Sequence, residues 1–239
     1  MRSVELRQQW SAYTATDHQV WATLYRRRMA SLRRTASRLF LEGIDAIGLR
    51  EDRIPDLEEV NERLAGRTGW RAVPVAGFLP AGEFFAALAR REFPTTITIR
   101  PPAQLEYLPE PDIFHDVFGH VPLHADPDFA DFLQRFGARA AAATGADLVG
   151  CTRLFWFTIE FGLVREEGEI KIYGSGLISS EKDAENALGP GCRRLPFALP
   201  RVREQDFRID DIQPLLFVVD GFADLRAAVD PPAGRPACG

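Results

Sequence analysis

Three of the four histidines in this 239-residue chain fall within ten residues, at His115, His120 and His124. A single histidine beside apolar residues is more often a hydrogen-bonded core residue than a metal ligand, so the spacing has to decide. On an ideal α-helix, residues five apart point about 140° away from each other. We therefore expect the helix to end at Gly119, which frees the chain to turn His120 back toward His115.

The third histidine receives a different interpretation. His124 follows His120 by four residues, but Pro122 lies between them. We expect Pro122 to prevent a helix from resuming there, and we therefore interpret His124 as a surface residue.

A third metal ligand is expected from Glu160, the carboxylate inside the apolar stretch 154–163. Burying a carboxylate among aromatic side chains is costly unless it is paired or bound to a cation. One alternative is a buried salt bridge to an arginine such as Arg153. Two histidines and one carboxylate form the facial triad of non-haem Fe(II) oxygenases. Zinc hydrolases also use two histidines and a glutamate, so the residues alone leave both metals open.

The surrounding pattern predicts an α+β domain that is predominantly helical, with a few short strands. Asp17 is expected to cap the first helix, and Pro111 is expected in the first turn of the helix that carries His115. The helices are expected at 17–41, 56–65, 82–91, 111–118, 126–144 and 148–164, and the strands at 95–100, 170–173 and 215–219.

Composition limits the class of protein. The length suits one domain, expected over residues 1–230, and the proline-rich tail 231–239 is expected to be disordered. A net charge of -5 disfavours a nucleic-acid partner. No stretch approaches the roughly 20 apolar residues that cross a bilayer, so no membrane partner is expected. Three widely spaced cysteines form no disulfide framework, and a cytoplasmic location is expected.

The segment 111–122, PDIFHDVFGHVP, resembles the iron-binding signature of the pterin-dependent aromatic amino acid hydroxylases, in particular the single-domain bacterial members that act on phenylalanine. The likeness covers residues 10–228 and a two-histidine motif with a distant glutamate is highly specific. Further similar segments are 13–25, 52–55, 68–70, 84–85, Arg100, 155–163 and 173–180.

The resemblance implies roles for individual residues. His115, His120 and Glu160 would bind Fe(II). Phe84 would stack on the ring of a tetrahydropterin, because a flat π-system suits an aromatic partner. The remaining residues expected near the pterin are Gly77, Leu79, Asp116, which would reach it through water, and Phe155.

The resemblance also implies a pocket for the amino acid. Arg100 would pair with the substrate carboxylate, steadied by Asp112, because a guanidinium presents a two-pronged donor to a carboxylate. Trp156, Phe161 and Ser179 would border this pocket.

The implied reaction is hydroxylation of an aromatic amino acid with O2, Fe(II) and a tetrahydropterin such as tetrahydrobiopterin. Phenylalanine, converted to tyrosine, is the leading substrate, and tryptophan or a different ring position stays open. A zinc hydrolase and a non-catalytic binding protein are the alternatives from other classes. A monomer is expected, because the regulatory and tetramerising segments of animal members have no counterpart in the sequence.

Two positions depart from the family pattern. Phe155 stands where many relatives have tyrosine, so the water network near the iron and the pterin is expected to differ. Leu108 stands where animal members have a hydroxyl residue.

Overall fold

The computed structural model describes residues 6–105, 110–209 and 211–230. Leu108 and the expected disordered tail 231–239 lie outside these residues. The helices are α1 (Ala15–Thr35), α2 (Arg38–Ala46), α3 (Leu57–Ala65), α4 (Ala81–Ala89), α5 (Pro127–Ala142), α6 (Gly145–Phe155), α7 (Ser175–Ser179), α8 (Glu181–Leu188), α9 (Leu199–Glu204) and α10 (Phe222–Val229). The strands are β1 (Arg71–Val75), β2 (Glu92–Thr96), β3 (Leu163–Glu166), β4 (Glu169–Ile172), β5 (Arg193–Pro196) and β6 (Leu215–Val219).

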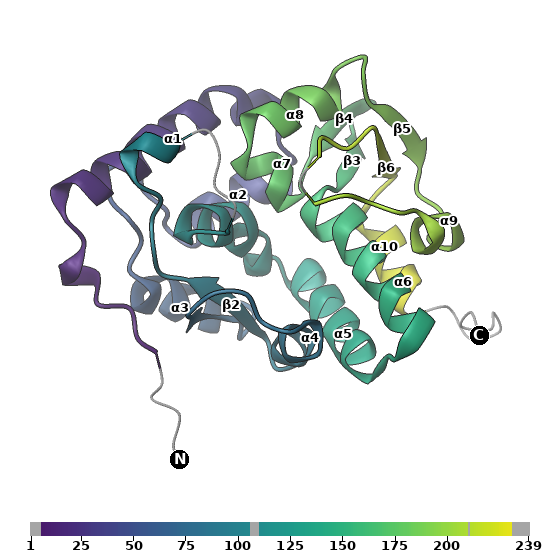
Figure 1. Ribbon diagram of the computed structural model, residues 1–239, viewed down its shortest axis with the longest axis horizontal. Coiled ribbons are helices and arrows are strands. Elements are labelled where there is room, and N and C mark those ends of the chain that lie inside the picture. The colour runs from purple at the N-terminus through teal and green to yellow at the C-terminus, as the bar shows by residue number, and fades with distance from the viewer. Residues whose placement is uncertain (1–5, 106–109, 210, 231–239) are drawn as a thin grey trace.

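Helices dominate, and the strands form two small sheets at opposite ends of the helical body (Figure 1). β1 and β2 pair in parallel, whereas the second sheet has the order β4-β3-β6-β5. In that sheet β3 and β4 form an antiparallel hairpin, and β6 runs parallel to both β3 and β5. The expected α+β class is confirmed.

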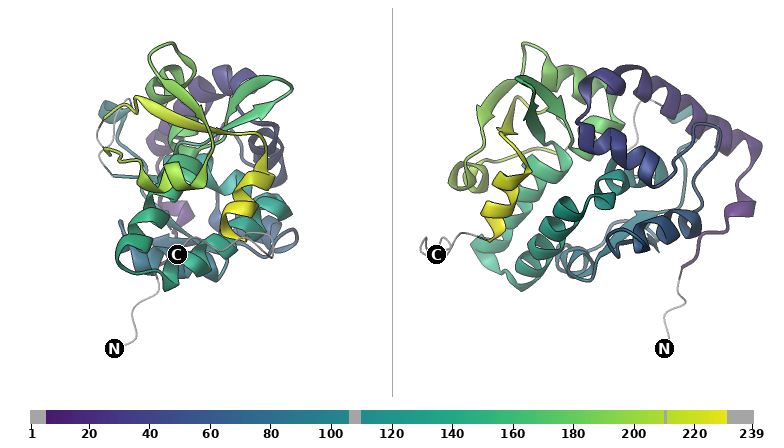
Figure 2. Two further views of the ribbon diagram at one scale, coloured as in Figure 1. Left: turned by 90° about the vertical axis from the view of Figure 1, so that its right-hand side faces the viewer. Right: turned by 180° about the vertical axis from the view of Figure 1, so that it is seen from behind.

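One buried apolar cluster draws on elements from α1 to α10 and joins the N-terminal helices to the segment that carries the histidines. Trp21 of α1 is fully buried, and its ring meets the edges of Phe114 and Phe118 at centroid distances of 5.4 and 6.4 Å. Phe114 and Phe118 also stack on each other at 4.6 Å. This aromatic packing positions the histidine segment against α1. The right-hand view of Figure 2 shows α1 from behind.

Several of the expected helix boundaries are wrong. Thr14, not Asp17, caps α1, and Asp17 completes the reciprocal capping box from the third helical position. The helix expected to reach residue 41 breaks at Ala36 and Ser37, which are extended, and Ser37 donates its backbone N–H to Ile172 O. The serine side chain then caps α2.

Other wrong boundaries concern one strand and two helices. The strand expected at 95–100 lies at 92–96 and contains Pro94. Both strands of this sheet are edge strands, and an edge tolerates a residue without an N–H. The helix expected over 148–164 ends at Glu160, and Leu163 begins β3. Pro111 precedes the histidine helix, which begins at Phe114.

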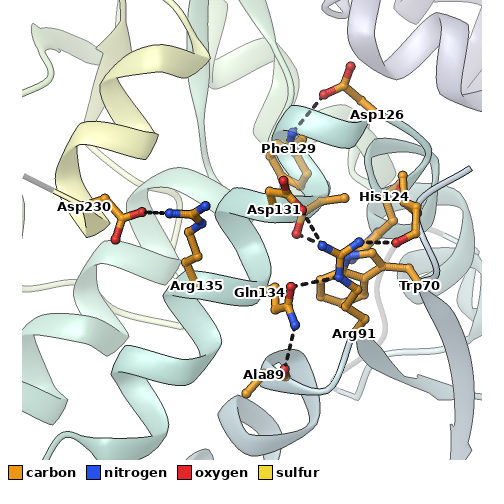
Figure 3. Close-up of polar contacts among 12 residues, drawn as sticks. Trp70, Ala89, Arg91, His124, Asp126, Phe129, Asp131, Gln134, Arg135 and Asp230 are labelled. Carbon is orange, nitrogen blue, oxygen red and sulfur yellow. Dashed lines mark hydrogen bonds and ion pairs between the residues drawn. The ribbon is translucent and has the colours of Figure 1, made fainter.

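Arg91 fastens the connection between α4 and β2 onto α5 (Figure 3). Its backbone has a φ of 59°, in the region that L-residues rarely adopt. The guanidinium donates to Gln134 Oε1 at 2.8 Å and also bonds Asp131 and the carbonyl of Thr68. These bonds offset the cost of the unusual backbone conformation.

His124 is buried, so its interpretation as a surface residue is wrong. Pro122 does not stop the chain from coiling: it occupies the first turn of a 3₁₀ helix, Val121–Ala125, where a missing N–H costs nothing. His124 is 2% exposed, and its ring packs against Trp70 at a centroid distance of 4.5 Å (Figure 3). Its Nδ1 lies 2.9 Å from His120 O, while Nε2 has no partner among the described residues.

Burial, with the nearby His120, lowers the pKa of His124 to about 3. An unfolded histidine has a pKa of about 6.5. Between these values the unfolded chain binds a proton that the folded chain does not, so acidification destabilises the fold by up to about 1.4 kcal/mol per pH unit. We predict that His124→Phe flattens the loss of stability as the pH falls below 6.5. Urea unfolding of the metal-free protein at pH 7, 6 and 5 measures this, and equal slopes for the two proteins would contradict it.

Candidate metal centre and substrate cavity

His115 and His120 lie on the same π-helix, Phe114–His120, and Glu160 ends a second one, Trp156–Glu160. A π-helix bonds residue i to i+5 and has more residues per turn than an α-helix, so residues five apart lie closer to the same face. The two imidazole rings are accordingly 5.1 Å apart between centroids. The expected helix end at Gly119 is wrong, because the histidines converge through a wider helical turn rather than through a break.

Gly119 serves a different purpose. A Cβ built on it would lie 3.1 Å from both Cβ and O of Ser175. The missing side chain thus lets the π-helix approach α7 closely.

The three predicted ligands meet at one point. His115 Nε2 lies 3.5 Å from Glu160 Oε1, and His120 Nε2 lies 3.2 Å from Glu160 Oε2. One ligand atom from each residue falls within 4.8 Å of the others, which makes the trio a group able to hold a metal ion. Arg153, the alternative partner of the carboxylate, pairs with Asp206 instead.

The surroundings keep Glu160 ionised. Burial alone would raise the pKa of this carboxyl group, but the interactions with His115 and His120 and a hydrogen bond from Ser175 outweigh it and lower the pKa to about 2. Among the described residues, no lysine or arginine lies within ion-pair distance of Glu160. A buried, ionised carboxylate without such a partner favours the binding of a cation.

Two serines of α7 form hydrogen bonds with two of the predicted ligands. Ser179 Oγ lies 2.9 Å from His115 Nδ1, and Ser175 Oγ donates to Glu160 Oε2 at 3.0 Å. With Nδ1 directed at Ser179, the other ring nitrogen of His115 faces Glu160. The role of Ser175 was missed from the sequence, although it lies in a segment that carries the family resemblance.

A cavity of about 420 Å³ opens beside this group. Seven residues expected at the site line it: Arg100, His115, Phe155, Trp156, Glu160, Phe161 and Ser179. Sequence reasoning missed Phe78 and Ile209, which line the same cavity although their side chains are 73% and 74% exposed. Exposed apolar side chains in loops carried no signal that would have placed them there.

Arg100 and Asp112 form a buried, two-pronged ion pair, as expected. Arg100 Nε and Nη2 donate to the two carboxylate oxygens of Asp112 at 2.8 and 2.9 Å. Asp112 also accepts the backbone N–H of His115 at 3.0 Å. One carboxylate therefore connects the arginine at the cavity wall to the backbone of a predicted metal ligand, and this bonding keeps the pKa of Asp112 low despite its burial.

Of the five residues expected near a pterin, only Phe155 lines this cavity. The Phe84 ring meets Phe155 edge-on at 5.3 Å, and Phe155 lines the cavity while Phe84 does not. Gly77 and Leu79 flank the cavity residue Phe78, but Leu79 lines a separate pocket against α4. Asp116 is buried, which raises its pKa, and its Oδ2 accepts two hydrogen bonds from Thr96.

Comparison with known proteins assigns the family. The family model described as biopterin-dependent aromatic amino acid hydroxylase matches residues 9–231. The phenylalanine-4-hydroxylase of Caulobacter vibrioides is 44% identical over 221 residues, which are 92% of this chain and 75% of the relative.

Solved structures of the Chromobacterium violaceum phenylalanine hydroxylase are similar to this chain in fold and sequence. One with bound iron(III) and 7,8-dihydrobiopterin has a TM-score of 0.90 at 42% identity, and the match covers 94% of this chain and 83% of that one. Another with iron and phenylalanine has a TM-score of 0.89 at 40% identity, over 96% and 84% of the two chains. The chain belongs to the biopterin-dependent aromatic amino acid hydroxylase family.

Gly176 offers a test of the site that spares its ligands. An added Cβ would lie 2.9 Å from Glu160 Oε1, so the flexible carboxylate would have to move. We predict that Gly176→Ala weakens metal binding at least about tenfold, as is typical for changes beside ligands. The loss in free energy of unfolding should be smaller than the loss in free energy of metal binding. Competition with a chelator measures the affinity. The control is Gly82→Ala, where nothing lies within 4 Å of the added carbon. Equal affinities for both variants would refute the contact.

Proposed function

We propose that this chain converts phenylalanine to tyrosine, using O2, Fe(II) held by His115, His120 and Glu160, and a tetrahydropterin as co-substrate. The observation that carries the proposal is the convergence of these three side chains at the wall of an aromatic-lined cavity. Family membership and the phenylalanine-4-hydroxylases among the relatives support the reaction class and the substrate.

The donor set fits iron. His115, His120 and Glu160 would supply two imidazole nitrogens and one carboxylate, the donor set of non-haem Fe(II) oxygenases. The same ligands also suit a zinc hydrolase, and family membership favours iron over zinc. When bound, iron and the reduced pterin supply the redox chemistry that activates O2.

The chain's own residues bind and orient the two organic substrates. Arg100 would take the substrate carboxylate, because Asp112 holds its guanidinium fixed while the side chain faces the cavity. Trp156 and Phe161, whose rings lie 4.8 Å apart, would contact the aromatic ring of the amino acid. Binding of both organic substrates in this cavity would exclude water from the proposed metal site.

The pterin would lie on the Phe155 side of the cavity, and the stacking expected of Phe84 would require its side chain, now edge-on against Phe155, to move. Phe78 would cover it from the loop that also contains Gly77 and Leu79. Because Phe155 has no hydroxyl group, this wall offers the pterin no hydrogen bond from that position.

We further propose a single-domain, monomeric and cytoplasmic enzyme. One continuous core supports a single domain, and every group of the proposed site comes from one chain. The free, buried cysteines Cys151 and Cys192 suit a reducing compartment. None of the helices in the described part of the chain is long and apolar enough to cross a membrane. Light scattering of the purified chain tests the monomer.

The reaction itself is tested by turnover. The protein is loaded anaerobically with Fe(II) or Zn(II) and given tetrahydrobiopterin, O2 and phenylalanine, tyrosine or tryptophan, with products separated by chromatography. Tyrosine formed only from phenylalanine, with Fe(II) and with pterin, supports the proposal. Turnover with zinc alone, or a preference for tryptophan, would overturn it.

The next prediction concerns the three proposed metal ligands. His115→Ala, His120→Ala and Glu160→Ala each leave two protein ligands, which cannot hold the cation against water, so stable iron binding is lost. Glu160→Gln preserves the side-chain volume and is therefore milder for folding than Glu160→Ala. Metal content after desalting is the measurement. One iron per chain with full turnover in any alanine variant would remove that residue from the ligand set.

Arg100→Lys tests the substrate contact. Lysine keeps the charge but loses the two-pronged geometry, so the KM for phenylalanine should rise while the KM for the pterin changes little. A charge-assisted hydrogen bond is worth about 1.5–3 kcal/mol, or roughly tenfold to a hundredfold in affinity.

Phenethylamine, which lacks the carboxylate, is the control substrate. It should bind weakly to the unmodified protein and lose almost nothing further in Arg100→Lys. An equal loss for phenethylamine and phenylalanine would mean that Arg100, through Asp112, only supports the fold.

A further inference from the structure

Arg28 is a buried cation that no part of the proposed chemistry uses. It lies on α1, its residue is 3% exposed, and it borders the same cavity as His115 and Glu160. Burial lowers its pKa to about 10, so it stays charged at neutral pH. A buried charge is costly unless strong hydrogen bonds compensate, so its partners indicate what it does.

The hydrogen bonds described for Arg28 all go to uncharged oxygens, and the carboxylates of Glu181, Glu185 and Asp183 interact with it only electrostatically. Its Nε donates to Ile178 O at 2.7 Å, and its Nη2 donates to Leu177 O at 3.0 Å. Nη1 reaches Ser31 Oγ at 3.3 Å. Leu177 and Ile178 lie in the last turn of α7, where carbonyl groups have no helical N–H to accept. A cation favours this end of a helix, because the carbonyl dipoles point toward it.

α7 has only five residues, yet its two terminal serines bond two of the three proposed metal ligands. Ser175 donates to Glu160, and Ser179 is paired with His115. A helix this short is not stable by its own backbone bonding. Its position depends on what holds it from outside, and the guanidinium of Arg28 holds the carbonyls directly before Ser179.

We propose that Arg28 is a positioning residue for the metal centre: it fixes α7, and α7 in turn fixes His115 and Glu160. Among the described residues, no hydrogen bond or ion pair joins Arg28 to His115, His120 or Glu160. It acts over a separation of 150 residues in sequence, from the first helix of the chain to the helix behind the ligands. The inference rests on the proposed ligand set and adds a residue that the family motif in 111–122 does not include.

The test compares two changes at Arg28 with a matched change on the same helix. Arg28→Met removes the charge and all donors, and Arg28→Lys keeps the charge but offers one ammonium group in place of the fork. The control is Arg26→Met, where an exposed arginine paired with Glu51 is lost. Co(II) is the metal probe. Its affinity is measured by competition with a chelator, at a temperature where thermal unfolding shows each metal-free variant to be fully folded.

The expected result is a loss of Co(II) affinity of roughly tenfold to a hundredfold in Arg28→Met, a smaller loss in Arg28→Lys and less than twofold in Arg26→Met. The visible spectrum of bound Co(II) should change in both Arg28 variants, because the ligand geometry relaxes. Unchanged affinity and spectrum, with only a lower melting temperature, would overturn the proposal and leave Arg28 as part of the fold.

A double-mutant cycle tests whether Arg28 acts on the metal site through α7. It uses Arg28→Lys, so it remains possible if Arg28→Met does not fold. If Arg28 acts through α7, Arg28→Lys should weaken Co(II) binding much less in a Ser179→Ala background than in the unmodified protein. Additive effects would overturn the proposal. Failure of the unmodified protein to bind Co(II) would instead refute the proposed metal site.

Discussion

The site depends on one buried negative charge. Glu160 ends an apolar segment, and its side chain is only 13% exposed, so the carboxylate has lost most of its hydration. Such a group requires compensation, and the fold supplies it from two imidazoles and a serine hydroxyl rather than from an arginine. Imidazole and hydroxyl groups take the place of a lysine or arginine here, and a bound cation would complete the compensation. The close packing of α7 and of both π-helices around this carboxylate follows from that requirement.

The same logic separates two of the arginines that line the cavity, Arg100 and Arg28. Arg100 is neutralised by Asp112, so the pair as a whole adds little net charge beside the metal. Arg28 has no such partner described and is held by carbonyl groups instead. A buried ion pair fixes geometry without a strong field, whereas an arginine on helix carbonyls keeps much of its positive charge. The carboxylates of Glu181 and Asp183, which also line the cavity, interact electrostatically with Arg28 and offset part of this charge.

Much of this site was predictable from the sequence, because the ligand motif, the isolated carboxylate and the family resemblance indicate the same three residues. The route by which they converge was not. Gly119 was expected to break a helix, since the pattern assumes 3.6 residues per turn and a π-helix depends on the packing of its neighbours. His124 was misplaced for the same reason: Pro122 is compatible with the start of a new helical turn, and only the surrounding aromatic rings decide burial.

Boundaries failed where distant contacts determine them. The break between α1 and α2 exists because Ser37 bonds Ile172, a residue 135 positions later, and no local signal reports such a contact. Pro94 inside β2 is tolerated only because the sheet has two strands. In contrast, α3 and α5 were close to their expected limits, since Asp56 and Asp126 cap them locally.

The wide sequence separation of the groups behind the ligands has a consequence for how the protein folds. Arg28 and Ile178 are 150 residues apart, and His115 and Ser179 are 64 apart. Contacts of this range form late and slow the search for the native state, because long loops must close before they gain stabilising energy. The three ligands adopt their mutual geometry only when the first helix and the last third of the described chain have come together. Uptake of metal would then follow folding rather than nucleate it, and a tightly held ion would mark chains whose topology is complete.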